Sequence, residues 1–239
     1  MTVFLRLILA HMFSDFVFFR ASTEKIKRER PALGHALHLS VYMLCIIILC
    51  RPYMDVPWLM FGGLCFNGWM MLPALLAIHF AVDFLDRADI SAAGRFNTVS
   101  FLLWQVVAVS ALFLVFPYVP LSAEGSFAGY FDKFLIIAAG ALFATYFVMM
   151  LNYFIRRDLT AAGFPLVDEQ YFNILYRIVL YFLMLVPGIA CWPLAIGWIA
   201  LAAFIRKMAR IDELPLRIYF ATSLTIAAAL AVKVTLAYA

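Results

Sequence analysis

Charged residues are scarce in this chain of 239 residues: only 13% are Asp, Glu, Lys or Arg, whereas 67% are hydrophobic. Soluble domains contain about 25% charged and roughly 45–50% apolar residues. A soluble core of this size cannot bury so much apolar surface, so the composition excludes a soluble globular protein. The apolar runs are continuous rather than alternating, which argues against a membrane β-barrel.

Cysteine is also rare, with four residues and no CxxC pair. Cys45, Cys50, Cys65 and Cys191 lie in or beside apolar runs, so we expect them to pack as small hydrophobic residues rather than form disulfides or metal sites. The net charge of +4 comes from short segments between apolar runs, where basic residues set membrane orientation, and it is not a signal for nucleic acid. The first apolar run has no clear cleavage site, which predicts a retained span.

What the chain does contain is a series of apolar runs of helical length. They predict an all-α, polytopic transmembrane bundle of seven or eight spans, forming one integral-membrane domain over 1–239 without a soluble domain. The glycines and proline within 57–86 predict a broken or partly re-entrant start, followed by a helix from about residue 70. The predicted spans cover about 3–20, 33–50, 70–86, 99–117, 132–154, 171–190, 194–206 and 216–237.

The distribution of Lys and Arg predicts the orientation. The polar loops 20–30, 86–97, 156–170 and 206–217 carry basic residues and alternate along the chain, whereas 117–130 has no Lys or Arg. Basic loops stay on the cytoplasmic side, so both termini are predicted outside. The loop 20–30 is in addition a candidate for binding anionic lipid head groups of the bilayer.

All four histidines precede residue 84, and two of them belong to a repeated spacing. His11 and Asp15 are four residues apart, as are His79 and Asp83. In a helix this spacing places both side chains on one face. Ionisable groups within a membrane span are costly and usually mark a functional site. Residues 1–97 are therefore predicted to carry the site, and 98–239 to complete the bundle.

The predicted topology brings these groups to the cytoplasmic ends of the first three spans, with an amide from the fourth. Imidazole and carboxylate ligands suit a divalent transition metal such as zinc, manganese or iron. Three ligands would leave one position open for a water molecule that the metal acidifies. The predicted metal ligands are His11, His35, His38 and His79, and the predicted catalytic residues are Asp15, Asp83 and Gln105.

Two functional hypotheses remain open at this point. In the first, His11, His79 and either His35 or His38 bind the metal. Asp15 or Asp83 ligates it or acts as a base, and Gln105 orients a ligand. The protein would then be a metal-dependent hydrolase or transferase acting on a lipid-like substrate. In the second, no metal binds, and the cluster joins helices or carries protons in a membrane partner, effector or transporter-like protein.

The blocks that carry these residues resemble bacterial membrane proteins catalogued as domain of unknown function 3307. The resemblance implies an integral protein of the bacterial inner membrane and supports the location of the site, but it implies no reaction. Where that family often has an Asp-Gln pair and a further His on the fourth span, this chain keeps only Gln105. The similar blocks are Leu9-Ala-His-Met-Phe-Ser-Asp15-Phe, His35-Ala-Leu-His38, His79-Phe-Ala-Val-Asp83-Phe-Leu-Asp-Arg87, Ala203-Phe-Ile-Arg-Lys-Met-Ala-Arg210 and Ile218-Tyr-Phe-Ala-Thr-Ser-Leu224.

Overall fold

A computed structural model describes residues 2–18, 26, 29–93, 97–115, 126–160, 167–209 and 215–238. Nearly all of them are helical, which confirms the predicted all-α class. Within these described residues, five helices are long and apolar enough to cross a membrane, which indicates a membrane protein. These five are Pro31–Tyr53, Gly68–Leu85, Phe131–Leu159, Cys191–Met208 and Arg217–Ala237. Most of the basic loop 20–30 lies outside the described residues.

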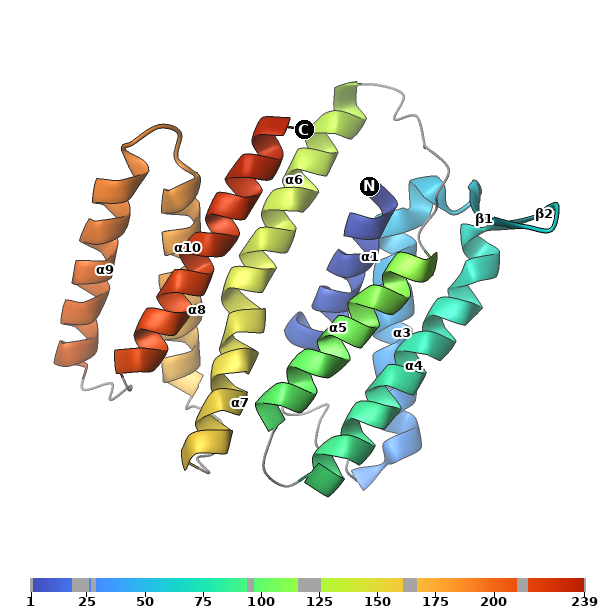
Figure 1. The fold of residues 1–239 in the computed structure, drawn as a ribbon, viewed down its shortest axis with the longest axis horizontal. Helices are drawn as coiled ribbons and strands as arrows, with labels where there is room; N and C mark the ends of the chain where they lie inside the picture. The colour runs from blue at the N-terminus through green and yellow to red at the C-terminus, as the bar shows by residue number, and fades with distance from the viewer. Residues whose placement is uncertain are drawn as a thin grey trace. The chain divides into compact units, whose positions relative to one another are not determined.

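The chain divides into two compact units, residues 1–135 and 136–239, and the division falls within helix α6 (Ser126–Leu142). In the first unit, helices α1, α3, α4 and α5 run side by side (Figure 1). Its elements are α1 (Thr2–Met12), the π-helical turn η1 (Phe13–Val17), α3 (Pro31–Cys50), the 3-10 turn η2 (Arg51–Tyr53), β1 (Pro57–Phe61), β2 (Leu64–Asn67), α4 (Gly68–Ala93) and α5 (Asn97–Val115).

The segment 57–67, for which the sequence predicted a broken or partly re-entrant start, forms a β-hairpin ahead of the helix. β1 and β2 pair antiparallel, with Met60 opposite Cys65 and Phe61 opposite Leu64. Gly62 and Gly63 form the turn with φ of 58° and 84°, angles that favour glycine in two-residue hairpins. A short apolar run fits a strand as well as a helix, so the sequence did not distinguish the two here. The following helix begins at Gly68, close to the predicted residue 70.

Two helices extend further than their apolar runs. α4 continues to Ala93, through the predicted loop that starts at residue 86, and α6 begins at Ser126, within the predicted loop 117–130. Hydropathy locates only the part of a helix that is apolar, and polar turns at helix ends remain helical beyond it.

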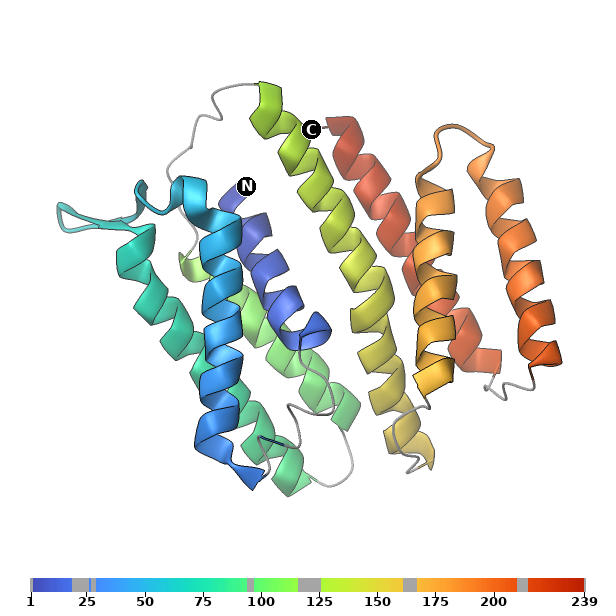
Figure 2. The ribbon, with the colours of Figure 1, turned by 180° about the vertical axis from the view of Figure 1, so that it is seen from behind.

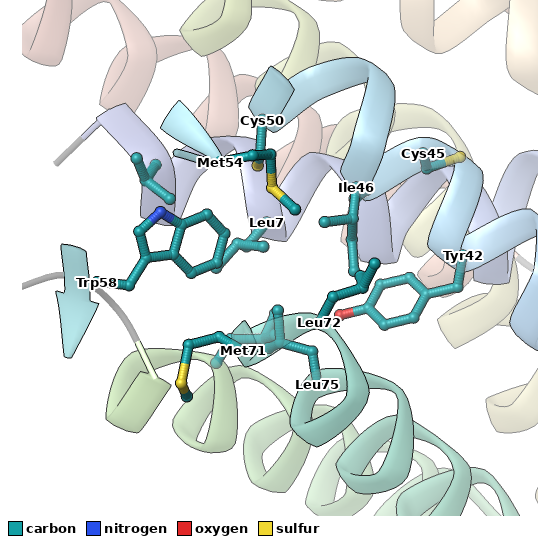
Figure 3. Packing of buried hydrophobic residues seen from close by; sticks show 13 residues of the cluster. Leu7, Tyr42, Cys45, Ile46, Cys50, Met54, Trp58, Met71, Leu72 and Leu75 are labelled. Atoms are coloured by element: carbon teal, nitrogen blue, oxygen red, sulfur yellow. The ribbon is translucent and has the colours of Figure 1, made fainter. Parts of the chain in front are cut away.

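Apolar side chains from α1, α3, the hairpin and α4 form the core of the first unit (Figure 3). Trp58 and Tyr42 are its largest fully buried side chains. Trp58 lies 1% exposed and donates its indole N–H to the carbonyl oxygen of Tyr53 at 2.8 Å, so the one polar atom of this ring is satisfied. The core lies toward the hairpin end of the unit, where α3 ends and α4 begins.

Arg6 of α1 is buried within the same unit and is held by three kinds of contact. It donates to the carbonyl oxygen of Leu49 at 2.7 Å and forms an ion pair with Asp132 of α6 at 3.2 Å. Its guanidinium also lies 5.0 Å from the ring centroid of Tyr53 and 4.8 Å from that of Phe131. A buried cation is tolerated only when paired in this way.

The second unit contains the rest of α6, the π-helical turn η3 (Phe143–Phe147), α7 (Val148–Thr160), α8 (Val167–Leu185), α9 (Cys191–Met208) and α10 (Pro215–Tyr238). α8 packs against both α9 and α10 (Figure 2). Arg177 of α8 donates to the carbonyl oxygen of Thr145 at 3.0 Å, within the π-helical turn. Arg206 of α9 donates to Asn173 of α8 at 2.9 Å. These buried arginines join neighbouring helices of this unit.

Candidate functional site

Four segments of the first unit position the predicted site residues. α1 carries His11 in its last turn, and the π-helical turn that follows carries Asp15. α3 carries His35 and His38, α4 carries His79 and Asp83, and α5 carries Gln105. π-helical turns are rare and occur often at functional sites. The structure therefore places all seven predicted side chains in one set of packed helices, with five of them in one network of contacts and His35 and Asp83 in a separate pair.

Asp15 lies at the centre of this cluster. Its carboxylate accepts a hydrogen bond from Ser14 Oγ at 2.7 Å. Its Oδ2 lies 3.4 Å from His11 Nδ1, and its Oδ1 lies 3.4 Å from His38 Nε2 and 3.5 Å from His79 Nε2. The three imidazoles are buried, whereas the Asp15 side chain is 20% exposed. One carboxylate thus faces three imidazoles from three helices.

His79 is held from two sides by residues of α3. Its Nε2 lies 3.0 Å from His38 Nε2, so one of these two nitrogens carries the proton that the other accepts. The ring of Tyr42 stacks on the His79 ring with a centroid distance of 4.0 Å and an interplanar angle of 25°. Both contacts fix the orientation of the His79 ring, which is what a metal ligand or a proton relay requires.

Among the described residues, one group meets the geometric requirement for a metal site: His11, Asp15 and His79. One nitrogen or oxygen from each lies within 4.8 Å of the other two. Ligands about 2.0–2.1 Å from a tetrahedral ion are roughly 3.4 Å apart, so rotation of the side chains would bring the three into range. Two histidines and one carboxylate form a ligand set of the kind found in catalytic zinc sites.

Gln105 supports one of these ligands. Its Oε1 lies 3.2 Å from His11 Nε2. An amide oxygen only accepts hydrogen bonds, so this contact places the imidazole proton on Nε2 and leaves the lone pair on Nδ1, which faces Asp15. A partner that fixes the tautomer of a ligating histidine is a usual feature of metal sites. The orienting role predicted for Gln105 stays a prediction.

His35 and Asp83 form a separate pair one helical turn away. His35 Nδ1 lies 2.8 Å from Asp83 Oδ2, which is the shortest contact between an imidazole and a carboxylate among the described residues. The structure thus groups His11 and His79 with Asp15, and it pairs His35 with Asp83. His38 contacts two members of the first group, Asp15 and His79.

A small cavity adjoins the ligand set on the side toward the apolar core. Its volume is about 10 Å³, which is at the lower limit for one water molecule. His11, Tyr42 and His79 line it, together with apolar side chains of α4 and α5. The Tyr42 hydroxyl is buried and has no hydrogen-bond partner among the described residues. The cavity thus has polar groups for a single bound water, but no room for a larger substrate.

Sequence reasoning missed Tyr42 and gave Ser14 no role. Tyr42 follows His38 by four residues, so the spacing of His35, His38 and Tyr42 already placed them on one stripe of α3. Ser14 donates to Asp15 and also to the carbonyl oxygen of His11 at 2.9 Å, so it orients the carboxylate rather than acting as a nucleophile. Both Ser14 contacts are local, to the residue three positions before it and to the next residue, so a helical reading of this segment could have shown them.

Comparison with known proteins points to the same half of the chain. The family model described as Protein of unknown function (DUF3307) matches residues 3–133, which is nearly the whole first unit and contains every residue of the cluster. No curated protein matches the chain, and no solved structure does.

Proposed function

Because the chain belongs to that family, whose matched region contains the entire cluster, we propose that the cluster binds one divalent transition metal ion and serves metal-assisted hydrolysis or group transfer on a lipid-like substrate. Zinc, manganese and iron are the metals that this ligand chemistry suits. The observation that carries the proposal is a distance: one ligand atom each from His11, Asp15 and His79 lies within 4.8 Å of the other two, although the residues come from two segments far apart in sequence.

The number of ligands favours a catalytic site over a structural one. Structural zinc sites are closed by four protein ligands, whereas catalytic sites use three and bind water in the fourth position. The open position would face the side where the Asp15 side chain is 20% exposed, away from the small cavity. A metal-bound water loses its proton near neutral pH and becomes a nucleophile for an ester or phosphoester.

The surroundings support a substrate that arrives through the bilayer. The helices of the first unit expose large apolar side chains such as Leu44, Ile48 and Phe84. Since the cavity admits only water, the substrate would approach on the opposite side, where the Asp15 and Asp83 side chains are 20% and 19% exposed. By the distribution of basic residues this is the cytoplasmic face of a bacterial inner membrane, with the N-terminus outside. The basic loop 20–30 would bind anionic head groups at the same face.

One observation favours a second candidate function. The Nε2 atoms of His38 and His79 are 3.0 Å apart, and Asp15 lies within 3.5 Å of three imidazoles. Such a network can join three helices or carry protons without a metal. In that case the protein is a membrane partner, effector or transporter-like protein rather than an enzyme.

Metal analysis separates the two candidates. We would purify the full chain in detergent and measure bound zinc, manganese and iron in the wild type, in a His11→Ala/His79→Ala variant and in a His35→Ala control, checking each for a single size-exclusion peak. The proposal expects about one equivalent of metal in the wild type and in the control, and none in the double variant. No metal in the folded wild type, after dialysis against each ion, would refute it and favour the network without a metal.

A further inference from the structure

His35 and Asp83 lie outside the ligand group, and their contact has a specific chemical consequence. His35 Nδ1 lies 2.8 Å from Asp83 Oδ2. A carboxylate accepts but does not donate, so Nδ1 carries the proton and donates it to Asp83. In the neutral ring the lone pair is then on Nε2. Asp83 thereby fixes which nitrogen of His35 can accept a proton, as the aspartate of a Ser-His-Asp triad does.

The second nitrogen of the His35 ring, Nε2, is not used by the pair and is able to accept a proton. His35 Nε2 makes no hydrogen bond or ion pair with any described residue, and His35 is the most exposed of the four histidines, at 9% against 3–6% for the others. The other three imidazoles differ: His11 Nε2 faces Gln105, and the Nε2 atoms of His38 and His79 face each other. Of the four histidines, His35 is therefore the one whose outer nitrogen can exchange a proton with water or substrate.

The pair is close to the ligand group. His35 precedes His38 by three residues on α3, and Asp83 follows His79 by four on α4. Side chains at such spacing are neighbours on a helix, about 5–6 Å apart at Cβ. The contacts between the two helices therefore form two successive layers, His38 with His79 and His35 with Asp83. The second layer lies away from the cavity, on the side where the proposed substrate would enter.

We infer that His35 and Asp83 form a proton-transfer dyad for the metal site, with His35 as the general acid and base and Asp83 as its positioning residue. This inference rests on the proposed function. As the attacking water forms its bond to the ester carbon or phosphorus and the bond to the leaving-group oxygen breaks, the O–H bond of the water would break and its proton would pass to His35 Nε2, directly or through one water. Asp83 remains ionised and stabilises the imidazolium. His35 then returns the proton to the oxygen of the leaving group, so no proton is gained or lost over the cycle.

A chain with four histidines allows a direct test without a known substrate. We would label the full chain with ¹⁵N-histidine, reconstitute it in phosphatidylglycerol/phosphatidylcholine nanodiscs and record imidazole nitrogen shifts with and without zinc. The inference expects His35 to show a protonated Nδ1 and a free Nε2, to lose this tautomer preference in Asp83→Ala, and to show no zinc-bound shift. It further expects diethyl pyrocarbonate to modify His35 several-fold faster than His11, His38 or His79.

Each contrary outcome has a distinct meaning. A zinc-bound shift on His35 would make it a ligand and overturn the inference while leaving a metal site. A proton on Nε2, a tautomer unchanged by Asp83→Ala, or slow modification of His35 would also overturn it. If zinc changes no histidine signal, the proposed function fails, and the tautomer and reactivity of His35 then show whether an accessible dyad exists without a metal partner.

Discussion

Asp15 and Asp83 offer the sharpest test of the site, because the structure gives them different contacts. Asp15→Asn removes the one anionic member of the ligand group. Asp83→Asn makes the same chemical change at a residue outside that group, one helical turn beyond His79. Both side chains are about equally exposed, 20% and 19%, so general effects of burial are matched.

The expected difference follows from the ligand count. Structural zinc sites with four ligands bind with apparent free energies of about 10–16 kcal/mol, or roughly 2.5–4 kcal/mol for each ligand. Losing Asp15 should therefore weaken zinc binding by on the order of 10²–10³-fold. Asp83 lies outside the ligand group and its side chain is 19% exposed, so losing its charge should weaken zinc binding by less than about tenfold.

Competition against a chromophoric zinc chelator, on detergent-purified protein at one pH, would measure both affinities. A thermal melt of each metal-free variant would check that the fold is kept. Equal losses in the two variants, or an unchanged affinity in Asp15→Asn, would show that the ligand group is wrong.

Three further predictions concern the fold. Gly140→Ala should destabilise the second unit by about 1–3 kcal/mol, because the added Cβ would overlap a tyrosine hydroxyl and lie 2.5 Å from a valine methyl. Gly197→Ala, with open space around it in α9, should instead stabilise by about 0.5–1 kcal/mol in thermal melts. Asp132→Ala should cost about 3 kcal/mol because it leaves Arg6 buried without its carboxylate, and Arg6→Met/Asp132→Leu should recover most of that loss. Cys65 should be the one thiol that an impermeant maleimide labels on intact cells, because the other three cysteines are buried.

Specific outcomes would contradict these three predictions. The glycine argument fails if both alanine variants shift the melting temperature in the same direction. The ion-pair argument fails if the double variant is less stable than Asp132→Ala. Labelling of Cys65 only after cell lysis would reverse the predicted orientation, since the hairpin would then face the cytoplasm.

The sequence by itself determined the fold class and most of the helical segments, and it predicted the location of the site. Long apolar runs can bury their backbone polar groups in lipid only as helices, so the runs predicted the helices. The same signal could not resolve residues 57–67, because a short apolar run fits a strand as well as a helix. It also misplaced the ends of α4 and α6, because polar helical turns lie beyond the apolar part.

Residue spacing along one helix also predicted contacts in the site, but only contacts between residues of that same helix. The distance of four residues correctly placed His11 beside Asp15, at 3.4 Å. The same distance between His79 and Asp83 suggested an equivalent pair, yet Asp83 bonds to His35 at 2.8 Å. The tertiary structure decided this, because the partner of a side chain across an interface depends on the rotation and axial register of two packed helices. The hydrophobic pattern defines which face of a helix is buried, but it does not define which residues of two buried faces lie at the same level.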